Sequence, residues 1–109
     1  MITYDDFLKV EIRVGTILEV DEFPRAHKPA YRLKIDFGPF GVKQTSAQIT
    51  AFYGKEELVG RQVAAVMNFP PKDIAGFQSE VLLLGPVWGD GRVVLLSPER
   101  PTANGTRVL

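Results

Sequence analysis

Hydrophobic and polar residues alternate along much of the chain, with the period of two that is typical of half-buried β-strands. In the clearest run, Tyr31, Leu33, Ile35 and Phe37 share one side and charged residues occupy the other. This alternation predicts a strand over Tyr31–Phe37 with one face in a hydrophobic core.

Similar runs predict further strands before and after this one. They are Val14–Val20, Val42–Gln48, Gln62–Met67, Glu80–Leu84, which we expect to be fully buried, and the short Arg92–Leu96. The run that begins at Val14 ends at Phe23-Pro24, since proline cannot donate to a strand ladder. Gly89-Asp90-Gly91 predicts a hairpin turn before the last run.

Two short helices interrupt the strands. Thr3 has the character of an N-cap, followed by acidic residues and then Phe7 and Leu8, and a second helix is predicted over Thr50–Leu58 with Gly60 as its C-cap. The order is helix, three strands, helix, two or three strands, within a single domain over 1–109. It favours an all-β, five-stranded Greek-key barrel of the OB type, with an SH3-like barrel as the alternative.

Composition excludes several classes of site. The chain has 109 residues, no cysteine and one histidine, so disulfides, thiolate metal sites and multi-histidine sites are impossible. We expect no metal and no cofactor. No apolar run has the length of a membrane span and no secretory signal is visible, so we expect a cytoplasmic protein that does not insert into membranes. Asn104-Gly105 predicts a turn.

Catalytic motifs are missing from the sequence. It contains no glycine-rich phosphate loop and no nucleophile elbow, and the neighbouring carboxylates Asp5/Asp6, Asp21/Glu22 and Glu56/Glu57 are explained as solvated residues at element ends. The sequence therefore predicts a binding protein and not an enzyme.

Charge is balanced overall but not locally. The 13 basic and 13 acidic residues cancel, yet residues 25–43 carry five basic residues against one acid, and residues 1–24 carry two against six. In an OB-fold the basic segment covers the ligand surface, which is built from strands 2 and 3 and two loops. The loop residue His27 borders that surface. The basic and amide side chains suit phosphates, unpaired bases or a peptide backbone.

Longer motifs carry a family resemblance. The segments Phe7–Gly15, Leu33–Gly38, Leu58–Arg61 and Ile74–Glu80 resemble the tRNA-binding OB domain that is attached to some aminoacyl-tRNA synthetases. Within that family, Glu22-Phe23-Pro24, Thr45–Ile49, Asn68–Pro71 and Ile74–Leu84 are similar to the CsaA branch, small bacterial proteins described as export-related chaperones.

The resemblance implies an OB-fold homodimer whose N- and C-terminal extensions pack across the two-fold axis. It also implies basic patches and apolar pockets that accept unfolded or precursor polypeptides. The chain has Ala26-His27-Lys28-Pro29 and Ser79-Glu80-Val81-Leu82 where the wider family has Ala-Asp-Lys-Leu and Ser-x-Gly-Met. Lys28 and Ser79 carry over, whereas the acid, the glycine and the methionine of the family pattern are missing.

Two functional hypotheses follow. The first is an ATP-independent chaperone, linked to protein export and its machinery, with a peptide cleft edged by Phe40, Gln44, Ser46, Gln48, Asn68 and Phe69. The alternative is a tRNA-binding module that uses Arg13, Arg25, Lys28, Arg32, Lys43 and Ser79. Exposed apolar residues at the ends of the barrel predict the homodimer interface, namely Tyr4, Phe7, Leu8, Val87 and Trp88.

Overall fold

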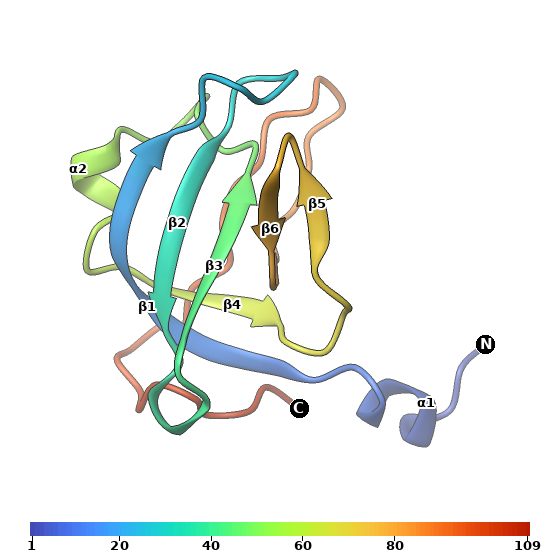
Figure 1. Ribbon diagram of the computed structural model, residues 1–109. Coiled ribbons are helices and arrows are strands. Elements are labelled where there is room, and N and C mark those ends of the chain that lie inside the picture. Colours follow the sequence, from blue (N-terminus) through green and yellow to red (C-terminus); the bar gives the residue numbers. More distant parts are fainter.

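The computed structural model describes residues 1–109, and its strands curl into a small barrel (Figure 1). In chain order the elements are helix α1 (Tyr4–Leu8), strands β1 (Ile12–Glu22) and β2 (Tyr31–Asp36), the 3-10 helix η1 (Gly38–Phe40), strand β3 (Val42–Ala47), helix α2 (Lys55–Leu58), and strands β4 (Gln62–Val66), β5 (Lys72–Ile74), β6 (Phe77–Ser79) and β7 (Leu82–Leu83).

Five strands form one antiparallel sheet in the order β3-β2-β1-β4-β7. The long strand β1 pairs with β4 through its first half and with β2 through its second half. The sheet closes where the Gln44 N–H donates to Glu80 Oε1 and the Glu80 N–H donates to the Gln44 carbonyl, both at 2.9 Å. This nearly closed barrel, with α2 between β3 and β4, confirms the all-β OB-type fold rather than the SH3-like alternative.

The core confirms the alternation read from the sequence. Leu33, Ile35 and Phe37 are fully buried, together with Ile17 of β1 and Val63 of β4. Charged neighbours on β2 lie on the outer face. The strongest strand prediction, Tyr31–Phe37, is therefore correct in its buried side and one residue too long.

The second predicted helix is shorter than expected. Only Lys55–Leu58 is helical, because two long-range hydrogen bonds hold Tyr53 outside the helix. Its carbonyl accepts from the Tyr31 hydroxyl (2.8 Å), and its own hydroxyl accepts from the Leu95 N–H (2.9 Å). The predicted start at Thr50 is wrong for this reason.

The last predicted strands are also corrected. Glu80–Leu84 is reduced to Leu82–Leu83, and Leu82 is half exposed rather than buried. Arg92–Leu96 forms no strand. It makes only the isolated bridge Val87–Val93 and single backbone bonds, since Pro86 interrupts the ladder opposite it.

The two turns predicted from glycine motifs are confirmed. The Gly89–Gly91 turn is present, with the Gly91 N–H donating to the Trp88 carbonyl at 2.8 Å. Gly105 has a φ of 91°, as the Asn104-Gly105 turn requires.

The β5–β6 hairpin was not predicted. Its two-residue turn is Ala75-Gly76, whose φ values of 50° and 84° are those of a tight hairpin.

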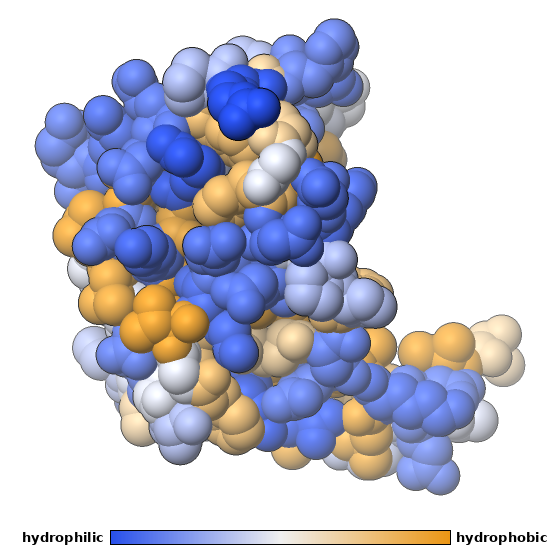
Figure 2. All heavy atoms as spheres, viewed as in Figure 1, coloured by the Kyte–Doolittle hydropathy of each residue, from blue (hydrophilic) through white to orange (hydrophobic).

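The two chain ends behave differently. The C-terminal tail lies along the start of β1 of its own chain, where the Val14 N–H donates to the Thr106 carbonyl (3.0 Å) and the Val108 N–H donates to the Ile12 carbonyl (2.8 Å). Helix α1 projects from the barrel, and Figure 2 shows hydrophobic surface on this projecting segment. None of the helices has the length and apolar character needed to cross a membrane.

Candidate functional site

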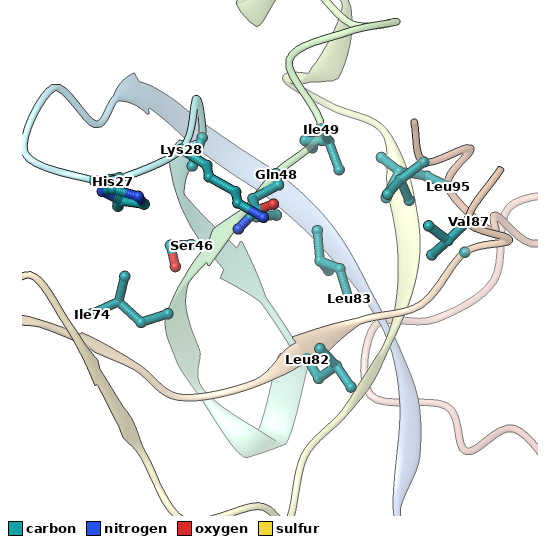
Figure 3. Close-up of a pocket in the computed structure, with 15 residues that line it drawn as sticks. His27, Lys28, Ser46, Gln48, Ile49, Ile74, Leu82, Leu83, Val87 and Leu95 are labelled. Carbon is teal, nitrogen blue, oxygen red and sulfur yellow. The ribbon is translucent and has the colours of Figure 1, made fainter. Parts of the chain in front are cut away.

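A hollow of about 480 Å³ opens at the end of the barrel where β3 finishes. Ten of its fifteen lining residues are hydrophobic. They come from the loop between β1 and β2, the end of β3 and the residues just after it, strand β5, strand β7 and the segment after β7. Figure 3 shows Lys28 and Gln48 at this hollow, with Ile74 on one side and Val87 and Leu95 on the other.

A second hollow of about 420 Å³ adjoins the first. It runs from Phe69 and Pro70 past the β5–β6 hairpin. The two hollows share Ser46, Ile74 and Leu82, so they form one elongated depression, which we call the groove. Strands far apart in sequence build it, because the barrel brings the end of β3 beside β7.

The floor of the groove is continuous with the barrel core. Ile49 and Leu95 line the first hollow and also belong to the core cluster, and Leu83 and Val93 pack against that cluster. The floor is therefore rigid and apolar. A ligand that covers it removes hydrophobic surface from water, which is favourable at about 25 cal/mol per Å².

Positive charge dominates the rim. Lys28 lines one hollow and Lys72 the other, and neither takes part in any of the six ion pairs of the structure. His27 stands beside Lys28. The single carboxylate that lines the groove is Glu80, and it already accepts the Gln44 N–H. The rim thus offers cations without counter-charges.

The predicted peptide contacts divide into two groups. Ser46, Gln48 and Phe69 lie on the groove, and the ring-bearing Phe69 is 54% exposed. Gln44 instead braces the barrel, since its side-chain amide donates to the Gln78 carbonyl (3.0 Å). Asn68 ties down the segment after α1, accepting from the Glu11 N–H (3.0 Å) and donating to the Lys9 carbonyl (2.7 Å).

Phe40 lies at the other end of the molecule. It belongs to η1, which joins β2 to β3 at the end opposite the groove. The Arg13 guanidinium stacks on its ring, 3.9 Å from the centroid.

The predicted nucleic-acid contacts are also dispersed. Arg25 and Lys28 are exposed on the loop at the groove rim. Arg32 donates to the Glu22 carbonyl (3.1 Å), and Lys43 is half-buried near the start of β3. Arg13 is occupied, because its Nε contacts Glu11 at 2.7 Å and its Nη1 donates to the Gly105 carbonyl.

The Ser79 side chain is likewise used within the fold. Its hydroxyl accepts from the Ser46 N–H at 3.1 Å and shares a 2.9 Å hydrogen bond with the Thr45 hydroxyl. Of the six predicted nucleic-acid contacts, Arg25 and Lys28 are the two that the structure leaves exposed on one loop.

The predicted interface residues lie in separate places. Tyr4, Phe7 and Leu8 all belong to α1, which has no buried residue. Val87 lines the groove and is 66% exposed. Trp88 packs edge-on against Phe52 at 4.9 Å, and Arg92 covers both rings.

Arg92 is itself fixed by the turn. Asp90 accepts its backbone N–H and its Nε, and the backbone hydrogen bond from Arg92 is the largest cause that lowers the pKa of Asp90. No three side chains of histidine, aspartate or glutamate come together as a metal site would need.

Sequence reasoning missed the apolar wall of the groove. Ile74, Leu82 and Leu83 are central to it, and their roles depend on the β5–β6 hairpin and on the shortened β7. The available signal was Ala75-Gly76 between two apolar residues, which is the spacing of a two-residue hairpin loop.

Comparison with known proteins agrees with this architecture. Residues 12–107 match the family described as "Putative tRNA binding domain". The methionine–tRNA ligase of Porphyromonas gingivalis strain ATCC 33277 is 39% identical over 107 residues, which are 98% of this chain but only 15% of the ligase. The chain thus spans about a seventh of such relatives.

Solved structures match the chain from end to end. The chaperone CsaA of Bacillus anthracis is 52% identical with a TM-score of 0.96, and the alignment covers 100% of this chain and 99% of that one. The CsaA chaperone of Picrophilus torridus is 55% identical with a TM-score of 0.92 over the whole of both chains. The protein belongs to the tRNA-binding domain family, in the branch that contains the CsaA proteins.

Proposed function

We propose that the protein is a non-enzymatic, ATP-independent chaperone that binds exposed segments of unfolded or precursor polypeptides in the groove. The observation that carries this proposal is the groove itself, an open depression with a mostly apolar lining next to the core. Monomeric proteins rarely expose such a surface without a binding role. The similarity to two structures of CsaA chaperones supports it.

The lining determines which segments would bind. Apolar side chains of a client would cover Ile49, Leu82 and Leu83, which supplies affinity. Lys28 and Lys72 favour segments that also carry carboxylates, since neither lysine has a partner in the free protein. Each contact is weak, as a chaperone that must release its clients requires.

A second candidate function is tRNA binding. The family match favours it, together with the exposed Arg25 and Lys28 on one loop and Arg32 and Lys43 on neighbouring strands. Phosphate contacts release counterions, so tRNA binding would weaken steeply as salt is added. Apolar capture of a peptide would change little with salt.

One titration separates the two functions. The purified protein is titrated with a labelled precursor peptide and with tRNA, at about 50 and 200 mM salt. We expect peptide affinity to vary little between the two conditions. Tight, salt-sensitive retention of tRNA without peptide binding would reverse the order of the two proposals.

A matched pair of variants locates the peptide. Leu82→Ser removes an apolar residue that is 50% exposed and lines both hollows. Leu18→Ser removes one that is 43% exposed on β1 and lines neither. We expect about a tenfold loss of peptide affinity in the first variant, because about half a leucine side chain is lost from the contact. Equal affinities in the two variants would place the peptide elsewhere.

We further propose that the protein acts in the cytoplasm as a homodimer, upstream of the export machinery. The exposed apolar residues of α1 support the dimer, and a chain without cysteine suits a reducing compartment. Two grooves in one particle would raise the overall affinity for a long client by multivalency.

A further inference from the structure

The groove lies where the wall of the barrel is not closed. Strand β3 is joined to the chain before β7 at Gln44 and Glu80, by the Thr45 hydroxyl on the Val81 carbonyl (2.6 Å), and by the Ser46 N–H on Ser79 Oγ (3.1 Å). Beyond Ser46 no hydrogen bond joins the two sides. An open seam therefore remains between the end of β3 and β7.

Gln48 presents an unpaired backbone to this seam. Neither its N–H nor its carbonyl forms a hydrogen bond. On β3 the backbone groups of Gln44 face Glu80, and alternate residues of a strand direct their N–H and carbonyl groups to the same side. The groups of Gln48, which directly follows β3, consequently face the seam as well.

Leu83 presents the same groups from the opposite wall. The Leu84 N–H donates to the Ala64 carbonyl (3.0 Å), so the backbone groups of Leu84 face β4. By the same alternation those of Leu83 face away from β4 and toward β3. The seam thus has one unpaired residue on each side, between apolar walls.

The charges around the seam indicate which kind of chain segment would bind between its two walls. Lys28 and Lys72 flank the seam without ion-pair partners, and Glu80 is already engaged by the Gln44 N–H. An extended chain offers backbone groups to both edges, as peptides do when they add a strand to a sheet. Acidic residues at its ends would meet the two lysines.

We propose that the groove binds its client as an added β-strand, with the backbone of an extended apolar segment paired to Gln48 opposite Leu83 and acidic residues at either end. This inference rests on the proposed chaperone function and specifies its substrate class. It requires backbone donors of the client and not only its side chains.

The test compares two forms of one peptide. The probe is a fluorescently labelled peptide of alternating leucine and threonine with aspartates at both ends. The second form carries N-methyl groups on its central residues, which keeps the side chains and removes the backbone donors, and the methyl groups also hold the two backbones too far apart for the peptide carbonyls to accept from the Gln48 N–H. We expect binding to weaken about tenfold, as the loss of one or two hydrogen bonds implies.

Variants of Gln48 test the protein side. Gln48→Pro removes an N–H that has no partner in the free protein, so the fold loses no hydrogen bond. Gln48→Ala keeps the backbone and is the control. We expect the proline variant to bind the unmodified peptide about three- to tenfold more weakly than the alanine variant, and the methylated peptide no more weakly than the alanine variant does.

Failure of this inference and failure of the proposed function give different results. If unmodified and methylated peptides bind equally, strand pairing is overturned while polypeptide binding stands. If the unmodified peptide does not bind at all, the proposed function is overturned, and this inference with it. The peptide comparison uses the unaltered protein, so it decides even if the proline variant does not fold.

Discussion

Thr45 is the one polar residue among the buried side chains of the barrel. Its hydroxyl donates to the Val81 carbonyl (2.6 Å) and accepts from the Ser79 hydroxyl (2.9 Å), at the point where β3 meets the chain before β7. Because backbone pairing is sparse at this closure, a side chain joins the two edges. Thr45 therefore fixes the width of the groove from below.

Thr45→Val tests this contact with almost no change of volume. The Val81 carbonyl would lose its donor in a buried position, so we expect the free energy of unfolding to fall by about 1–3 kcal/mol. Urea denaturation measures it. Thr106→Val is the control, since the Thr106 hydroxyl is exposed and bonds only the Ala103 carbonyl of its own turn, and we expect a change within about 0.5 kcal/mol. If both variants lost the same free energy of unfolding, the buried position of the Thr45 hydrogen bond would contribute nothing to stability.

Individual residues were the hardest to assign from sequence. Arg13 and Asn68 have side chains that suit phosphates and peptide backbones, yet the fold uses both internally. Arg13 binds the carbonyl of Gly105, 92 positions away, and Asn68 binds the N–H of Glu11, 57 positions away. Residue type predicts the chemistry of such a side chain, while only the tertiary structure determines its partner.

The β5–β6 hairpin stores strain at its turn. Ala75 has a φ of 50°, which costs a residue with a Cβ about 1–2 kcal/mol, and Gly76 follows with a φ of 84°. The hairpin carries Ile74 and Lys72 to the groove. Glycine or asparagine at position 75 would adopt this φ with less strain. Alanine at this position therefore lowers the stability of the hairpin.

Ala75→Asn and Gly76→Ala should therefore change stability in opposite directions. Asparagine tolerates positive φ, so we expect the first variant to gain about 0.5–1 kcal/mol in the free energy of unfolding. The second places a Cβ at a φ of 84° with open space around it, so only backbone strain acts, and we expect a loss of about 1–2 kcal/mol. Changes of the same sign in urea denaturation would contradict this account.

At the scale of elements, sequence prediction succeeded where strands are long and half-buried. Strands β1 to β4 were found because each has at least five residues, which is long enough for a hydrophobic pattern to show. Strands β5, β6 and β7 have three, three and two residues, which is too short for a period to show. These short strands supply five residues of the groove lining, namely Lys72, Ile74, Ser79, Leu82 and Leu83, so the candidate site was predicted less completely than the barrel.

At the scale of the whole molecule, helix α1 places no side chain in the barrel core. It has five residues, none of them buried, and a helix this short is not stable alone. Its capping box at Thr3 and Asp6, the Asn68 amide on Lys9 and the Arg107 guanidinium on Leu8 hold its ends. Tyr4 remains 63% exposed on its surface. A second copy of the chain would cover this face.

Sedimentation tests the homodimer. We expect micromolar protein to sediment with twice the 12.1 kDa mass of the chain. Tyr4→Ser should shift the equilibrium toward the monomer, whereas Leu18→Ser, on the barrel surface, should leave it unchanged. A 12.1 kDa species at this concentration would contradict the proposed dimer.

An unpaired strand edge is also a route to aggregation, because it can join the same edge of another copy. The chain has no net charge, so no overall repulsion keeps copies apart. Protection must be local, and Lys28 and Lys72 provide it, since two empty seams that met would bring these lysines together. The two lysines that would attract the proposed acidic client would therefore also keep copies of this chain apart, and this protection would fade as salt screens their charge.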